Sequence, residues 1–440
     1  MKQLDARQDD ASNEGPAAGG RNPYLALLRT PGALAFSSSG FVGRMSMSMY
    51  GLGTVLLIAS LTGKYGPGGT VAGAGSIGFA ALSPYIAQLA DRFGQRRVLL
   101  IQVAIFTLAS ATFIGSVELG APFGVMLATG FVAGAFMPSM SSMVRTRWSG
   151  LLAGDPQRLH AAFALESVND ELIFVIGPAL VTILATQVFA ASGVETAALL
   201  ATIGSLVFAL QRRTEPAPRP RPARPPGSPV RPRIRLRLPG VPAAGLITLS
   251  PAFLLLGVMF VTADLSTLAF ASQLGYRPLA GLVLGTYALG SAIGGLWYGS
   301  RHWTAPLGRR FIITATLVVA GVLLLFAMPN LLALDAACLL AGLPISATII
   351  AGYGILERQA PPHRRTEALA WLSSTISVGV AIGSGVAGHL IDAYGPKTGY
   401  VFSACCGAAG VLVCLAGQRK LATHDGDAAG TTEPVEAAAG

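Results

Sequence analysis

Long stretches of apolar residues recur along the chain, separated by short polar segments. A helix needs about 20 apolar residues to cross the hydrocarbon of a bilayer, so each stretch predicts one membrane-spanning helix. Six stretches lie at about 34–62, 69–90, 98–116, 121–144, 160–187 and 193–211, and six more at about 243–274, 278–298, 310–328, 331–355, 366–393 and 397–417. The stretches are continuously apolar rather than alternating, which excludes a membrane β-barrel. We therefore expect an all-α membrane protein with twelve transmembrane helices.

A segment rich in arginine and proline separates the two groups of six helices. Residues 212–242 contain nine arginines and ten of the 28 prolines, a composition that cannot bury a core and predicts an extended or disordered linker. The expected organisation is a tail at 1–33, a six-helix bundle at 34–211, the linker at 212–242, a second six-helix bundle at 243–417 and a tail at 418–440. The first 30 residues lack the apolar core of a signal peptide, so we expect them to be a disordered tail.

The distribution of lysine and arginine predicts the orientation. With the N-terminus inside, 27 of these residues fall on the inner side and three (Lys64, Arg277 and Lys397) on the outer side, while Arg44 lies within the membrane. By the positive-inside rule, both termini and the linker are expected in the cytoplasm, with the protein in the cell membrane. The linker arginines are expected to contact anionic lipid headgroups.

Charge and cysteine content exclude several classes of protein. Only 12% of the residues are charged, about half of what a soluble domain carries. The net charge of +10 is spread over short loops, so we expect no nucleic-acid partner. The four cysteines lie in apolar stretches without a CxxC pair or a histidine cluster, which argues against a disulfide framework or a metal site. No catalytic motif is present, so neither an enzyme nor a cofactor is expected, and we expect a monomer.

The two halves resemble each other at an offset of 206 residues. Nine identical pairs carry this resemblance: Ala135/Ala341, Pro138/Pro344, Pro156/Pro362, Arg158/Arg364, Ala162/Ala368, Ala164/Ala370, Ser167/Ser373, Ile176/Ile382 and Gly177/Gly383. Each half has an even number of helices, so the repeats run parallel and are related by an axis along the membrane normal. We therefore expect two pseudo-symmetric bundles with a substrate site between them near the midplane.

The segment between the second and third helices carries a motif. It reads AQLADRFGQRR over residues 87–97 and resembles the signature of the major facilitator superfamily at Asp91, Arg92, Gly94, Arg96 and Arg97, with Ala87 in place of the usual glycine. The resemblance implies a transporter with two six-helix bundles, in which this loop latches the halves in the outward-facing state. The corresponding loop of the second half has Ser300 at the aspartate position and four extra residues, so the latch is expected to depend mainly on the first half.

The fifth helix adds a second, partial motif. Gly177 and Pro178 resemble the core of the fifth-helix motif of drug:proton antiporters, although the further glycines of that motif are absent. A proline inside a membrane helix removes one backbone hydrogen bond and permits a kink. The resemblance favours an antiporter, and the missing glycines leave uptake by proton symport open.

Charged residues inside the predicted membrane region are the candidate coupling and cavity residues: Arg44, Glu166, Asp170, Glu171 and Asp264. At the positions aligned with Glu166, Asp170 and Glu171, the repeat-related helix has no acid, so the fold does not need acids there. One arginine cannot neutralise four carboxylates, and unpaired ionised carboxylates are costly in the low dielectric of the membrane. Some of the four are therefore expected to carry protons or to bind a cation. Asp170 is the first choice for proton coupling, and Glu171 is expected to pair with Arg44 or to meet the opposite half.

Methionines gather in the first and fourth predicted helices, which line the central cavity in the superfamily. Met45, Met49, Met137 and Met140 are candidates for lining the cavity, because methionine adapts to varied apolar ligands; filling the core is the alternative. We expect proton-coupled efflux of a small amphipathic or cationic compound. The alternatives are uptake by proton symport, a membrane-embedded enzyme or a non-transporting sensor. The sequence does not identify the cargo.

Overall fold

The computed structural model describes residues 23–218, 244–301, 303–359 and 365–421, and these residues form helices joined by short loops. The first half contains α1 (Pro23–Leu28), α2 (Ala33–Arg44), α3 (Ser46–Thr62), α4 (Tyr65–Phe93), α5 (Gln95–Glu118), α6 (Phe123–Ala135), α7 (Met140–Leu151), α8 (Pro156–Gln187) and α9 (Ser192–Leu210). The second half contains α10 (Ala244–Gln273), the 3₁₀ helix η1 (Arg277–Leu279), α11 (Ala280–Gly299), α12 (Leu307–Phe326), α13 (Leu331–Gln359), α14 (Arg365–Tyr394), α15 (Pro396–Ala416) and α16 (Gln418–Leu421).

Within these residues, 12 helical spans are long and apolar enough to cross a membrane. This confirms the predicted all-α fold and its helix number. Two spans are interrupted: the first divides into α2 and α3 at Met45, and the fourth divides into α6 and α7 at residues 136–139. Pro138 lies in the second interruption, where its missing N–H leaves one helical hydrogen bond unmade. Its repeat partner Pro344 lies inside the continuous helix α13, so the two halves differ at this point.

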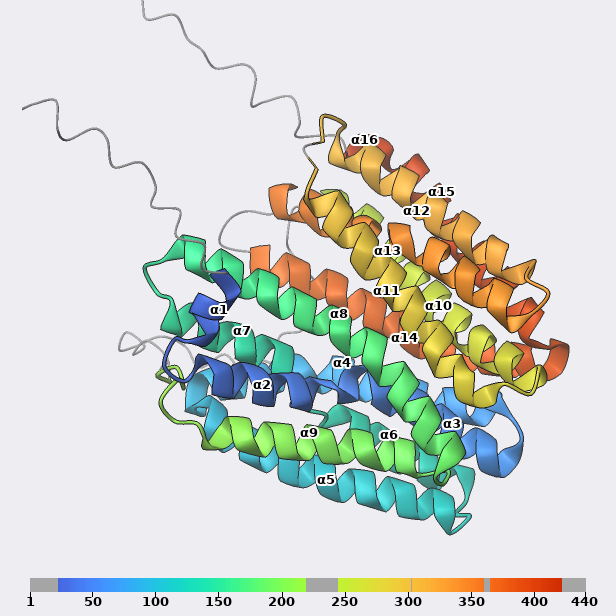
Figure 1. Ribbon diagram of the computed structural model, residues 1–440, viewed down its shortest axis with the longest axis horizontal. Helices are drawn as coiled ribbons and strands as arrows, with labels where there is room; N and C mark the ends of the chain where they lie inside the picture. Colours follow the sequence, from blue (N-terminus) through green and yellow to red (C-terminus); the bar gives the residue numbers. More distant parts are fainter. Residues whose placement is uncertain (1–22, 219–243, 302, 360–364, 422–440) are drawn as a thin grey trace, which may run out of the picture.

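The two halves form adjacent bundles, α1–α9 (blue to green) and α10–α16 (yellow to red), with α8, α11 and α14 where the bundles meet (Figure 1). One end of the molecule carries most of the described arginines, including Arg92, Arg158 and Arg309; we call it the arginine-rich end. The opposite end carries Lys64 and Lys397.

Close packing between the halves is concentrated toward the opposite end. A side chain at Gly69 of α4 would meet the carbonyl oxygen of Ser384 in α14, and a Cβ at Gly73 would lie 2.5 Å from the carbonyl oxygen of Ala381. Small residues let membrane helices approach to backbone contact. The described residues therefore form a closed interface between α4 and α14 at this end.

The tails and linker depart partly from the expectation of disorder. Residues 23–28 of the expected N-terminal tail form α1, and Leu27 is buried because it packs in the core of the first half. The first linker residues also pack: Thr214 is buried, and its hydroxyl accepts a hydrogen bond from Arg147. The rest of the linker, from 219, and the outer parts of both tails lie outside the described residues.

Candidate functional site

A buried ion-pair network joins three helices of the first half. Arg44, the last residue of α2, donates to both Glu166 and Asp170 of α8; the Nη1–Oδ1 distance to Asp170 is 2.8 Å. Arg145 of α7 donates to the other oxygen of Asp170 at 2.9 Å. The side chains of Arg44 and Glu166 are fully buried, whereas that of Arg145 is 42% exposed. Two arginines and two carboxylates thus neutralise one another.

Glu166 has a full set of hydrogen bonds. Its Oε1 accepts from the Ser37 hydroxyl and from the Trp148 indole, each at 2.8 Å, in addition to the pair with Arg44 through Oε2. Both oxygens of this buried carboxylate therefore have donors, which offsets part of the cost of removing the group from water. This arrangement is typical of a structural ion pair.

Arg145 changes the charge count expected from the sequence. The sequence suggested that Arg44 is the single arginine that faces the four acids. The structure corrects this, because Arg145 lies on α7, just beyond the interruption at 136–139, and reaches Asp170. The ion pair between Arg145 and Asp170 joins two different helices. Neither the spacing of residues within one helix nor the comparison of the two halves could have predicted it.

Glu171 points away from that network and contacts the other half. Its Oε1 accepts a hydrogen bond from the Ser346 hydroxyl of α13 at 3.2 Å. The Ser346 hydroxyl is also 2.7 Å from that of Ser291 in α11, so Ser291 donates to Ser346. No ion pair to Glu171 is found among the described residues. Glu171 was expected either to pair with Arg44 or to meet the opposite half, and the structure shows the second of these contacts.

Asp264 of α10 lies within the second half. Three ionisable side chains interact electrostatically with its carboxylate: Tyr287 of α11, Cys338 of α13 and Tyr400 of α15. Tyr400 also shares a hydrogen bond of 2.9 Å with Thr267, and the Tyr287 hydroxyl has no hydrogen-bond partner in the described chain. Asp264 therefore lies in a second polar cluster, in the other half from Arg44.

The signature loop lies at the arginine-rich end. Gly94 has a φ of +93°, which a residue with a side chain rarely adopts, so glycine is required at this turn. The backbone N–H of Arg96 donates to Glu215 at 2.8 Å, so the start of the linker is bound to the loop. Asp91, Arg92 and Arg97 have exposed side chains, and Asp91 makes no hydrogen bond or ion pair with a described residue. The expected latch is not engaged in this conformation.

Contacts at the opposite end hold the halves together. The Asp392 carboxylate at the end of α14 accepts from the backbone N–H groups of Tyr65 (2.7 Å) and Gly66 (2.6 Å) at the start of α4. The Tyr65 hydroxyl also donates to Ser272 of α10 at 2.9 Å. A carboxylate satisfies the free N–H groups of a helix start and its partial positive charge. Sequence reasoning missed Asp392, because its partner lies in the other half.

Gly177 and Pro178 of α8 lie at a three-helix contact. A Cβ at Gly177 would collide with the Ser48 hydroxyl of α3, and a Cβ at Gly281 of α11 would collide with the carbonyl oxygen of Pro178. The Ser48 hydroxyl donates to the Ile173 carbonyl of α8 at 2.9 Å. The pair thus lies where α8 meets its own half and the opposite half.

The methionines are mostly core residues. Met45, Met49 and Met140 are at most 5% exposed and pack in the interior of the first half, and Met137 is half-buried against it. In this conformation the first three act as packing residues, so the structure does not support a cavity-lining role for them.

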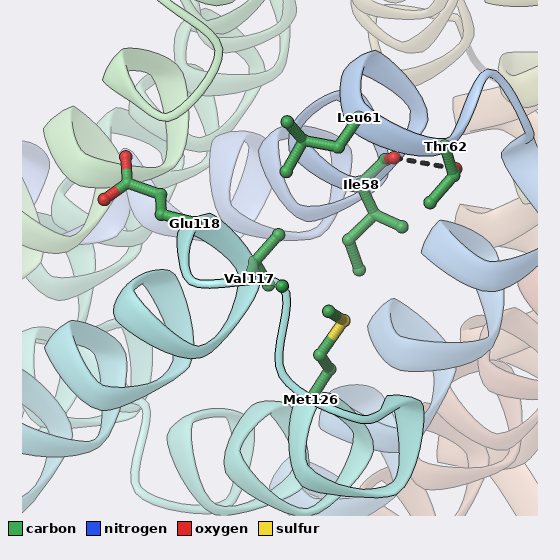
Figure 2. A pocket seen from close by; sticks show the side chains of 7 residues that line it. Ile58, Leu61, Thr62, Val117, Glu118 and Met126 are labelled. Atoms are coloured by element: carbon green, nitrogen blue, oxygen red, sulfur yellow. Dashed lines mark hydrogen bonds between the residues drawn. The ribbon is translucent and has the colours of Figure 1, made fainter.

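One cavity of about 250 Å³ lies at the opposite end of the first half, between α3, α5 and α6. Figure 2 shows Ile58, Val117 and Met126 around it, while the Glu118 carboxylate points away from them. The lining is almost wholly apolar, and none of the candidate coupling residues contributes to it. It is therefore separate from the ion-pair network.

These observations define a polytopic α-helical membrane protein built from two six-helix halves, with buried charges in its first half. A family model described as the Major Facilitator Superfamily matches residues 36–301 and 249–437. The chain belongs to the major facilitator superfamily. It is a secondary transporter rather than an enzyme.

Solved structures of other transporters share the fold. A mutant of the nucleoside transporter NupG superposes with a TM-score of 0.66 at 14% identity, covering 88% of this chain and 99% of that chain. A bacterial homologue of the iron transporter ferroportin, in its inward-facing state, gives 0.63 at 15% identity, covering 87% and 98%. The human organic anion transporter MFSD10 gives 0.59 at 15% identity, covering 90% and 100%. Identities this low show the fold alone. No curated protein matches the chain by sequence.

The exposed Asp91 leads to a prediction. Because the signature loop is expected to engage in the other conformation, Asp91→Asn should leave the protein folded while slowing transport by about tenfold through a shifted conformational equilibrium. Asp91→Glu, which keeps the charge, should retain more activity. Both are measured as flux in proteoliposomes, with ethidium as a probe for the expected amphipathic cationic cargo. Equal flux in wild type and Asp91→Asn would remove this role from Asp91.

Proposed function

We propose that the protein exports a small amphipathic or cationic compound in exchange for protons, by alternating access of the two halves. The observation that carries this proposal is Glu171, a membrane-embedded carboxylate without an ion pair in the described chain, hydrogen-bonded to Ser346 of the other half. If Asp170 were protonated, Arg44 and Arg145 would lose the negative charge with which both of them pair. Neutralising Glu171 leaves no arginine unpaired. Glu171 is therefore better suited than Asp170 to exchange a proton.

The hydrogen bond across the halves links protonation to movement. The Ser346 hydroxyl donates to the Glu171 carboxylate, and such a bond is about twice as strong when the acceptor is ionised. Protonation of Glu171 weakens this contact and so favours separation of α8 from α13. Release of the proton restores it. The proton thereby biases the equilibrium between the two conformations.

Two carboxylates without a cation partner in the described chain, Glu171 in the first half and Asp264 in the second, support a cationic cargo. A cation bound beside either carboxylate would compensate a negative charge that has no ion-pair partner among the described residues. The contact of Gly177 and Pro178 with α3 and α11 supports a role for this pair in closing the opposite end. These contacts are consistent with the antiporter resemblance of the motif.

We propose that the arginine-rich end faces the cytoplasm, as the positive-inside rule indicates. The interface closed by Asp392 and Gly69 then lies on the outer side, and the conformation described is inward-facing. A reporter active only in the cytoplasm should work when fused after Gly440, and one inserted at Lys64 should not. A signal of the opposite kind at both sites would reverse the topology.

Glu171→Gln tests the coupling. The variant should fold normally, because glutamine can still accept the Ser346 hydrogen bond, and should still exchange ethidium across vesicles without a gradient. Its pH-driven ethidium transport should fall to the leak rate. Glu118→Gln, an exposed carboxylate at the opposite end, is the matched control and should behave as wild type. Full pH-driven transport by Glu171→Gln would exclude Glu171 as the proton carrier.

A further inference from the structure

A second cavity, of about 400 Å³, opens at the arginine-rich end of the second half, between α11, α12 and α13. It is lined by Tyr298, Leu307, Arg310, Ile350, Gly354, Glu357 and Arg358. It belongs to the opposite half from the ion-pair network of Arg44 and contains none of the candidate coupling residues. The mechanism proposed above does not use it.

Two polar groups that line this cavity lack acceptors. Tyr298 is only 5% exposed, and its hydroxyl oxygen lies near the Arg310 guanidinium, which can only donate to it. The hydroxyl proton of Tyr298 and the Nε–H of Arg310 therefore have no acceptor among the described residues. The Arg310 guanidinium lies 5.5 Å from the centre of the Tyr298 ring, so both groups face the same space. Buried polar groups are nearly always hydrogen-bonded. Two donors left over in one cavity indicate a missing acceptor.

The start of α12 adds positive charge to the same place. The helix begins at Leu307, no side chain caps it, and its first turn contains no acidic residue. The free N–H groups and dipole of a helix start favour an anion, and arginine at that position is the opposite of the usual preference. Glu357 is the carboxylate of the lining, against Arg310 and Arg358. The start of the helix and the Arg310 side chain thus place two positive groups at one side of the cavity.

Aromatic residues locate the cavity at the membrane boundary. Trp297 and Trp303 are 54% and 38% exposed and contact each other edge-on, with ring centres 5.5 Å apart. The Arg301 guanidinium lies 5.6 Å from the Trp297 ring. Tryptophan with neighbouring arginine is typical of the headgroup level of a bilayer. Ile350, 44% exposed, gives the cavity an apolar side.

We propose that this cavity binds an anionic phospholipid. The phosphate accepts hydrogen bonds from Arg310, Tyr298 and the start of α12, and an acyl chain lies along Ile350. A phosphate matches the arginine fork and the helix start, while the apolar side favours a lipid over a free ion. The bound lipid ties the ends of α11, α12 and α13 together on one leaflet. This site is separate from any lipid contact of the linker.

Native mass spectrometry of the purified full chain tests the proposal, with phosphatidylglycerol and phosphatidylcholine as probes. Phosphatidylglycerol adducts should predominate, and Arg310→Gln should reduce their retention by about tenfold, the effect of losing one charged hydrogen-bond partner. The matched control is Arg309→Gln, which removes the same charge from the exposed neighbour in the same turn and should leave the adducts unchanged. Tyr298→Phe keeps every charge and should reduce retention by a smaller factor.

Three results would overturn the proposal. Equal losses in Arg309→Gln and Arg310→Gln would indicate general surface charge rather than a site. Displacement of phosphatidylglycerol by millimolar inorganic phosphate would indicate a site for the free ion. Should Arg310→Gln fail to fold, wild-type retention in Tyr298→Phe would by itself contradict the proposed site.

Discussion

Gly69→Val should reduce transport by about 10- to 100-fold while the protein remains folded and inserted. The new side chain would collide with the Ser384 carbonyl oxygen across the α4–α14 interface. This oxygen belongs to the backbone of a helix, so it cannot move aside as a flexible side chain could. Overpacking a close interface costs about 1–3 kcal/mol, and here that cost falls only on the conformation closed at the opposite end. The equilibrium therefore shifts toward the conformation open at that end.

The shift is measured between spin labels at Lys64 and Tyr394, exposed residues on either side of this interface. Their distance distribution should move to longer values in Gly69→Val. Gly115→Val is the control, because an added Cβ at Gly115 meets nothing within 4 Å. An unchanged distribution together with normal transport would show that closure of this end does not depend on the glycine contact.

Arg44→Met should produce the largest loss of stability. It leaves Glu166, which is fully buried, without its counter-charge, and breaking a buried pair in this way costs about 3–5 kcal/mol. Arg145→Met is the control: this side chain is 42% exposed and, among the described residues, forms an ion pair with Asp170 alone, so its loss should cost at most about 1 kcal/mol. The free energy of unfolding is measured by denaturant titration in detergent.

A double variant separates the ion pair from simple packing. Arg44→Met with Glu166→Gln removes both charges and should be more stable than Arg44→Met alone, because no uncompensated buried charge remains. If Arg44→Met and Arg145→Met cost the same, the buried network would not be the structural element described here.

Apolar stretches predicted the fold well, because crossing a bilayer imposes a length and a composition on each helix. The interruption of the fourth span at residues 136–139 was not predicted, since Pro138 and its repeat partner Pro344 look alike in sequence but behave differently. The packing of Leu27 and Thr214 was also missed, because isolated buried residues give no periodic signal.

The candidate site was predicted in part. Intramembrane charge pointed to Arg44, Glu166 and Asp170, since such residues are costly unless paired. The roles of Arg145 and Asp392 depend on contacts between helices far apart in sequence, and no local spacing encodes those contacts. The preference for Glu171 over Asp170 follows from pairing seen only in three dimensions.

Proton movement driven by cargo in the wild-type protein tests the central claim most directly. Proteoliposomes are loaded with ethidium and a pH-sensitive dye, with equal pH on both sides and the membrane potential held at zero. As ethidium leaves down its gradient, proton antiport predicts acidification of the lumen. Alkalinisation would show symport instead, and ethidium flux with no pH change would contradict proton coupling.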